Sequence, residues 1–235
     1  MSTPSKVWSR FSGRSGDLKL RILDAPKDRM NESIDLYLKH YLAGESLSKA
    51  AGISKNPVAM EEYRVFAHEG LAKPQSGIHI MICCIENDDD TIGDVIGVTF
   101  SYLSTSEDPS DVKLQPTSPE VQKKLQLVEG MLSLYNVLRE HQLDKCYDGF
   151  GIIVHPDYRG LGIAQEFLKA RRLMSAEQGV PITAAWMTSI GTQKAAQRDG
   201  YETVYEFNFE EFGKKHGVTF EDAPKVCKLM MYKVL

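Results

Sequence analysis

The chain has 235 residues, of which 42% are hydrophobic and 26% charged, which is enough for one sizeable domain around an apolar core. Its formal net charge of −4 argues against a general nucleic-acid binder, because such proteins usually carry a basic surplus. No apolar run approaches the roughly 20 residues of a membrane helix, and the start lacks an apolar signal core, so we expect a cytoplasmic protein without a membrane partner.

The N-terminal part of the chain predicts one strand and two helices. Residues 1–15 are polar and aperiodic, and we expect them to form a flexible segment ahead of one domain over 16–235. Apolar residues alternate over 17–24, as in a strand, and recur at helical spacing over 27–41 and 57–71.

The second predicted helix has a clear start signal. Asn56 is a suitable cap and Pro57 a suitable first helical residue. Because the pattern of the preceding helix ends near Gly44, we expect a short loop between the two helices.

The middle of the chain predicts a hairpin, a loop and a further helix. Two apolar, β-branched runs at 78–85 and 92–103 flank an acidic segment at 86–90. We interpret this acidic segment as a solvated turn rather than as a metal site. The polar and proline-containing residues 104–116 indicate a loop, and residues 119–141 are predicted to form one helix.

The four cysteines, Cys83, Cys84, Cys146 and Cys227, lack the paired spacing of a structural zinc site. The first two lie side by side in an apolar run. We therefore expect buried free thiols in a reducing cytosol, and no bound metal.

The C-terminal third alternates between strands and helices. Its predicted elements are strands at 149–155, 182–187, 201–207 and 226–234, and helices from 163 to about 174 and at 193–198. Strand–helix–strand order indicates an α/β layer structure with locally parallel strands, and the earlier hairpin makes the sheet mixed.

A glycine-rich turn joins the first strand and the first helix of this third, with the sequence Arg159-Gly160-Leu161-Gly162-Ile163-Ala164. The first amides of a helix have no partner within the helix and carry partial positive charge, so they attract phosphate. Gly160 and Gly162 allow a close approach and unusual backbone angles, and Arg159 adds a fixed positive charge. The turn therefore predicts a phosphate site.

Three kinds of nucleotide-binding turn have glycine-rich sequences similar to this segment. A P-loop needs Lys and then Ser or Thr after its last glycine, and neither follows Gly162. A dinucleotide-binding turn needs a third glycine where Gln165 stands, and an acid at the end of the strand 182–187. The turn resembles the R/Q-x-x-G-x-G/A turn of the GCN5-related N-acetyltransferases (GNAT), because Arg159, Gly162 and Ala164 match its fixed positions.

Over roughly 17–235, the chain resembles the insect arylalkylamine N-acetyltransferases. The resemblance implies one GNAT-type α/β (α+β) domain, with a mixed central sheet that is splayed at its centre and flanked by helices. It also implies acetyl-CoA as co-substrate, and a small amine such as dopamine, serotonin, octopamine or tyramine as acceptor, or a polyamine or agmatine. The amides of residues 159–164 would bind the pyrophosphate, and the edge of Ile152, Ile153 and Val154 would pair with pantetheine.

The resemblance also assigns catalytic roles. Glu45 matches the general base of the family's D/E-Glu-Pro-Leu segment, although Ser46 replaces the proline and should leave the loop less fixed. Thr188, Ser189 and Thr192 lie in a stretch that carries serines in the family. Near the closing strand, Lys225 replaces a histidine, and its charge would repel an ammonium ion.

These assignments agree with the chemistry of amine acetylation. An alkylamine has a pKa near that of lysine, about 10, so a base such as Glu45 must deprotonate it directly or through one water. Backbone amides at Ile153 and Val154 are candidates to bind the oxyanion. The thiolate leaving group, with a pKa near 8.5, could take a proton from Ser189 or Thr192, or leave unprotonated; the alternative role of a hydroxyl at position 192 is a helix cap.

Two further functions remain open at this point. One is a protein or peptide N-acetyltransferase of the same fold. The other is a noncatalytic acyl-CoA-binding protein, which the departures at Ser46, Thr188, Thr192 and Lys225 favour.

Overall fold

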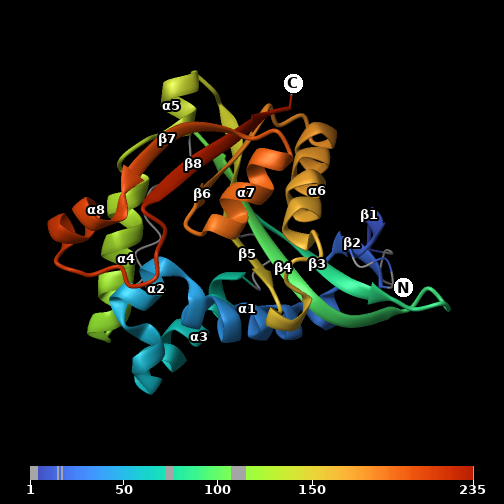
Figure 1. The fold of residues 1–235 in the computed structure, drawn as a ribbon, viewed down its shortest axis with the longest axis horizontal. Coiled ribbons are helices and arrows are strands. Elements are labelled where there is room, and N and C mark those ends of the chain that lie inside the picture. Colours follow the sequence, from blue (N-terminus) through green and yellow to red (C-terminus); the bar gives the residue numbers. More distant parts are fainter. Residues whose placement is uncertain (1–4, 15, 17, 72–76, 107–114, 235) are drawn as a thin grey trace.

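The strands of the computed structural model form a single sheet. The model describes residues 5–14, 16, 18–71, 77–106 and 115–234. The strands are Val7–Ser12 (β1), Lys19–Asp24 (β2), Ile78–Glu86 (β3), Ile92–Thr105 (β4), Lys145–Val154 (β5), Ile182–Met187 (β6), Glu202–Asn208 (β7) and Val226–Lys233 (β8). Their order in the eight-stranded sheet is β1-β2-β3-β4-β5-β6-β8-β7 (Figure 1). β5 and β6 are parallel and the other neighbouring pairs are antiparallel, so the sheet is mixed as predicted.

Helices cover both faces of this sheet (Figure 1). They are Met30–Gly44 (α1), Ser46–Ala51 (α2), Pro57–Leu71 (α3), Pro119–Leu132 (α4), Val137–His141 (α5), Ile163–Glu177 (α6), Ile190–Arg198 (α7) and Phe209–His216 (α8). One core cluster joins β3, β4 and β5 to α1, α2, α3 and α4, and others join the opposite face to α6 and α7. None of the helices in the described part of the chain combines the length and apolarity needed to cross a bilayer.

Several elements confirm the sequence interpretation. The hairpin of β3 and β4 lies where it was expected, and the Oδ1 atom of Asn56 accepts from the Val58 amide at 3.0 Å at the start of α3. All four cysteines are buried and free of disulfides. Burial raises the pKa of each thiol, as at Cys146 and Cys227.

Other elements differ from the prediction. Part of the segment 1–15, expected to be flexible, forms β1, because it pairs antiparallel with β2. Ser9 Oγ also donates to Glu166 on α6 at 2.7 Å, and Lys6 pairs with Glu177 on the same helix. The helix predicted over 119–141 is divided into α4 and α5. The break occurs because Asn136 adopts an extended conformation and caps α5 by accepting from the Arg139 amide at 2.9 Å.

Two short helices were missed altogether. The predicted loop after α1 contains α2, whose cap is the carboxylate of Glu45. α8 follows β7 directly, and Asn208 caps it by accepting from the amides of Glu210 and Glu211 at 2.8 and 3.2 Å. Residues 107–114 of the loop predicted over 104–116 lie outside the described residues.

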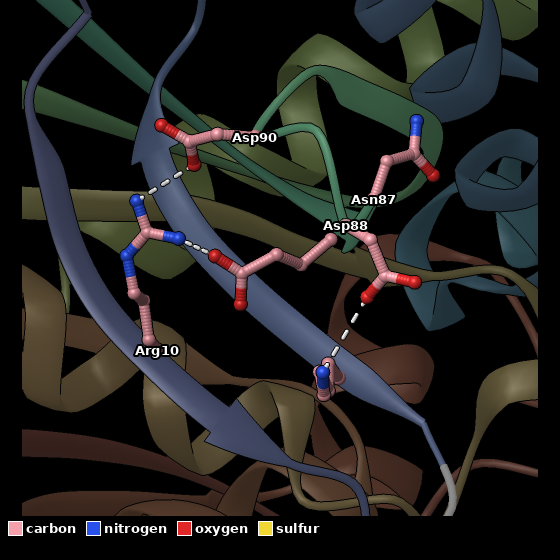
Figure 2. A pocket seen from close by; sticks show the side chains of 6 residues that line it. Arg10, Asn87, Asp88 and Asp90 are labelled. Atoms are coloured by element: carbon pink, nitrogen blue, oxygen red, sulfur yellow. Dashed lines mark hydrogen bonds and ion pairs between the residues drawn. The ribbon is translucent and has the colours of Figure 1, made fainter.

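The acidic turn between β3 and β4 is held by cations of β1 and β2. Figure 2 shows Arg10 reaching Asp90, at 3.0 Å, and Arg10 also pairs with Glu86. The nearly buried Arg21 donates to Asp90 at 2.8 Å, and Lys19 lies 3.5 Å from Asp88. The turn therefore ties the N-terminal hairpin to the sheet through ion pairs.

A carboxylate from α3 caps the start of α4. Glu62 accepts from the amides of Thr117 and Ser118 at 2.5 and 2.9 Å, and from both hydroxyls. Burial alone would raise the pKa of Glu62, but these hydrogen bonds favour its charged form and lower the pKa to about 2.

Candidate functional site

The pairing between β5 and β6 ends in the middle of the sheet. Their register runs from Tyr147↔Thr183 to Gly149↔Ala185. β5 nevertheless continues alongside β4 as far as Val154. Within the described chain, the side of β5 over 150–154 that faces away from β4 therefore pairs with no strand, and this is the predicted splay.

Strand alternation decides which main-chain groups face the open side. The His155 amide donates to Ile96 on β4 at 2.8 Å. Because successive residues point their NH and CO groups to opposite sides, Ile153 also faces β4, whereas Ile152 and Val154 face the opening. Of the three residues predicted to pair with pantetheine, Ile152 and Val154 thus supply the free edge.

A β-bulge lies at the point where the two strands separate. Gly151 is opposite Phe100 and Gly149 is opposite Ser101, which leaves Phe150 as an extra residue. A side chain at either glycine would meet a close neighbour. A Cβ atom at Gly151 would lie 3.0 Å from the Tyr37 ring, and one at Gly149 would lie 1.8 Å from Nη1 of Arg171.

The predicted phosphate turn follows directly after the open edge. Gly160 and Gly162 have φ values of +83° and +94°, a region that favours glycine. α6 begins after Gly162 without a side-chain cap. The amides of residues 160–164 find no acceptor in the described part of the chain, so they are available to an anion.

Two arginines flank this turn. Arg159 is exposed and its Nε atom donates to the Val154 carbonyl at 3.3 Å. Arg14 comes from the turn between β1 and β2: its amide donates to Leu161 at 3.3 Å, and its Nε atom lies 3.6 Å from the place of a Cβ atom at Gly162. Arg14 was not among the predicted site residues, because the N-terminal segment was expected to be flexible.

The side chain of Glu45 caps α2. It is 8% exposed, and its Oε1 accepts from the Leu47 amide at 2.9 Å. Its Oε2 accepts from the Ser48 amide and hydroxyl at 2.8 and 2.9 Å. A carboxylate has about four lone-pair positions, so about one position remains after these three bonds.

The two predicted catalytic segments lie next to each other. Ser46 Oγ donates to the Thr188 carbonyl at 3.1 Å, which joins the start of α2 to the loop between β6 and α7. The serine hydroxyl thus supplies a contact between the two loops that a proline ring lacks.

The hydroxyls of Ser189 and Thr192 bond to each other at the start of α7. Ser189 Oγ accepts from the Thr192 amide at 3.2 Å, and the two hydroxyl oxygens are 3.0 Å apart. Thr192 Oγ1 also donates to the Ser189 carbonyl at 3.0 Å. Ser189, rather than residue 192, is therefore the cap, and both hydroxyls are partly used in holding the helix.

A buried polar cluster connects Glu45 with the bulge. Tyr37 and Tyr41 stack with ring centroids 4.5 Å apart. Lys124 Nζ donates to the Tyr63 hydroxyl at 2.9 Å and lies 4.5 Å from the centre of the Tyr41 ring. Burial raises the pKa of Tyr37 and Tyr41, and the charge of Glu45 raises that of Tyr41 further. These tyrosines are therefore neutral hydrogen-bonding groups at the site.

Lys225 lies on the surface of the protein. Its side chain is exposed and, with Asn208, Lys214 and Phe220, lines a surface pocket between α8 and the start of β8. Its carbonyl accepts from the Phe209 amide at 3.1 Å.

Comparison with solved structures identifies the architecture, whereas no protein-family model matches the chain. A protein of the mosquito Aedes aegypti, named arylalkylamine N-acetyltransferase 7, superposes with a TM-score of 0.84 and 23% identity, covering 99% of this chain and 97% of that one. Arylalkylamine N-acetyltransferase 2 of the same species gives 0.71 and 15%, covering 92% and 99%. The Drosophila melanogaster polyamine N-acetyltransferase gives 0.70 and 13%, covering 91% and 99%.

These neighbours and the splayed mixed sheet agree with each other. The predicted fold is confirmed: the chain has the GNAT fold, in the form found in insect arylalkylamine N-acetyltransferases.

Proposed function

We propose that the chain is an acetyl-CoA-dependent N-acetyltransferase that acts on the primary amine of a small arylalkylamine or a related amine. The observation that carries the proposal is the row of free amides at 160–164, which adjoins the open edge of β5. The structural neighbours of the chain are named for acetyl transfer to arylalkylamines and polyamines, and these names support the same type of reaction here.

The distance between the turn and the bulge suits coenzyme A. Pyrophosphate at residues 159–164 would place the pantetheine arm along Ile152 and Val154. That arm contains about as many chain bonds as four extended residues, so it reaches about 13 Å. Four residues of β-strand rise by about the same length, which brings the thioester from Val154 to the bulge at Phe150.

Acetyl transfer at that position requires a base and hydrogen-bond donors. Glu45 is the proposed base, which accepts the proton that the ammonium ion must lose before nitrogen attacks the thioester carbon. Of the two amides that face the opening, that of Ile152 is nearer the bulge and is the proposed donor to the oxyanion, whereas that of Val154 is left to the pantetheine arm. The Ile153 amide, which was predicted as a donor, faces β4 and is not available. After attack the nitrogen carries one further proton. As the C–S bond breaks, the sulfur takes a proton from Ser189 or Thr192, which is replaced by the proton that the nitrogen loses; if the sulfur leaves as thiolate, that proton passes to solvent. Thr188 contributes its carbonyl to the loop.

A noncatalytic acyl-CoA-binding protein is the second candidate. It is favoured by one feature, namely that Glu45 and Ser189 both act as helix caps. In that case the turn and the open edge would bind coenzyme A, but no amine would be acetylated.

An amine panel separates the candidates. Binding of coenzyme A is measured by calorimetry, and thiol release from acetyl-CoA is measured with dopamine, tryptamine, histamine, agmatine and spermidine. We expect binding and turnover with at least one amine. Binding without turnover on any amine supports the second candidate, and absence of binding refutes both.

A further inference from the structure

Arg171 of α6 is a buried arginine close to the proposed reaction centre. It is 1% exposed. Its Nη2 donates to the Thr99 hydroxyl at 2.7 Å and to the Phe100 carbonyl at 3.3 Å. Its Nε and Nη1 have no hydrogen-bond partner among the described residues. Such a side chain is unusual, because buried charges are normally paired and fully hydrogen-bonded.

The nearest acid does not form an ion pair with it. Asp148 is half-buried and accepts from Ser104 at 2.5 Å, and no carboxylate of the described chain lies within 4 Å of the Arg171 guanidinium. Burial lowers the pKa of Arg171, while the more distant Tyr201 and Asp148 act in the opposite direction. Packing alone would be served as well by an apolar side chain of similar length.

Arg171 is connected to the bulge through one hydroxyl. Thr99 Oγ1 accepts from Arg171 and donates to the Gly151 carbonyl at 2.8 Å. The guanidinium also occupies the space that a side chain at Gly149 would need. Arg171 and Thr99 thus contact both ends of the three-residue bulge, at the place where β5 and β6 separate.

We propose that Arg171 is a positioning residue for acyl transfer, a role that rests on the proposed function. Through Thr99 it fixes the peptide plane of Gly151, whose carbonyl belongs to the same peptide group as the amide of Ile152. That amide is one of the two that face the opening. Arg171 therefore sets the direction of a proposed oxyanion donor without contacting the substrate.

The size of the effect follows from the geometry of the donor. Hydrogen-bond donors stabilise a developing oxyanion only when they point at its final position. A displacement of about 1 Å can reduce the rate about 100-fold while the protein stays folded. Loss of the hydrogen bonds from Arg171 through Thr99 to the Gly151 carbonyl should therefore lower kcat. The KM for acetyl-CoA should stay nearly unchanged, because the pyrophosphate turn is not involved.

The test compares Thr99→Val with Thr99→Ser. Valine keeps the volume of threonine and removes the hydroxyl, whereas serine keeps the hydroxyl. Arg171→Met also breaks the hydrogen bonds between Arg171, Thr99 and Gly151. Arg172→Met is its matched control, since Arg172 is the next residue of α6 and pairs with Asp199 at 2.8 Å instead of with Thr99. For each variant, kcat, KM for acetyl-CoA, calorimetric affinity for coenzyme A and Tm are measured.

We expect kcat to fall about 10- to 100-fold in Thr99→Val and Arg171→Met. Thr99→Ser should keep at least half of the wild-type kcat, and Arg172→Met should have the same kcat as the wild type. Affinity for coenzyme A should change less than threefold throughout. Equal kcat values in Thr99→Val and Thr99→Ser would overturn the role of Arg171 and leave the proposed function intact. The same conclusion would follow if kcat fell across the variants only in proportion to the fall in Tm. A wild-type protein that binds acetyl-CoA without turnover would overturn both.

Discussion

Replacement of Glu45 separates its two roles, the helix cap and the proposed base. Glu45→Ala removes the acceptors of two amides, and loss of such a cap costs about 0.5–2 kcal/mol of stability. Glu45→Gln keeps a carbonyl oxygen for one of these amides but turns an NH2 group towards the other, and should lose about 1–3 kcal/mol of stability. A domain that is stable by about 5–15 kcal/mol remains folded in both cases.

The effect on activity should exceed the effect on stability. Loss of a general base reduces the rate about 10²- to 10⁴-fold, which corresponds to about 2.7–5.4 kcal/mol of activation free energy. Ser48→Ala is the matched control, since it removes one hydrogen bond to the same carboxylate and should lose about 1 kcal/mol of stability with little change in rate.

The assay combines kcat/KM for the best amine of the panel with urea denaturation of the same samples. The reasoning is refuted if Glu45→Gln retains more than a fifth of the wild-type kcat/KM. It is also refuted if Ser48→Ala loses as much activity as Glu45→Gln, because the rate would then follow the cap and not the base.

Three other perturbations address the turn and the helix caps. Arg14→Ala should raise the KM for acetyl-CoA about tenfold, because one charged hydrogen bond of about 1.4 kcal/mol or more is lost. Arg10→Ala is the control and should leave this KM unchanged in steady-state kinetics. Gly162→Ala strains a residue at φ +94° by about 1–2 kcal/mol and should weaken calorimetric binding of coenzyme A at least tenfold, while Gly179→Ala, at φ +62°, should lower only stability. The depressed pKa of Glu62 stabilises the fold fully above about pH 4.5, and this contribution is lost as pH falls towards 2. Glu62→Gln should flatten the pH dependence of urea denaturation in that range, and an unchanged slope contradicts the assignment.

The sequence predicted those parts of the fold that have a strong local signal. The hairpin at 78–103 and the helix after Gly162 show clear periodicity, and both lie where expected. β1, α2 and α8 have six to eight residues each and depend on tertiary contacts or on side-chain caps. Short elements of this kind cannot be recognised by periodicity, since their stability comes from residues distant in sequence.

The same distinction applies to the site. The glycine turn could be predicted because an exposed helix start and positive φ are local properties. Arg14 and Arg171 could not, because their roles depend on which segments pack together. A signal for Arg171 was nevertheless present: it follows Phe167 by four residues on the apolar face of α6, where a charged residue is unexpected.

The fold explains the consequence of having Ser46, rather than the proline of the family pattern, at the start of α2. Ser46 is the first residue of α2, and Glu45 before it is extended with ψ at 137°. A proline is favourable at such a first helical position, and an extended residue suits the position before it, which explains why proline stands there in the family. Serine gives up that rigidity but adds the hydrogen bond to Thr188. The orientation of Glu45 therefore depends here on a contact between two loops, so that a change at 188–192 can affect the proposed base without touching it.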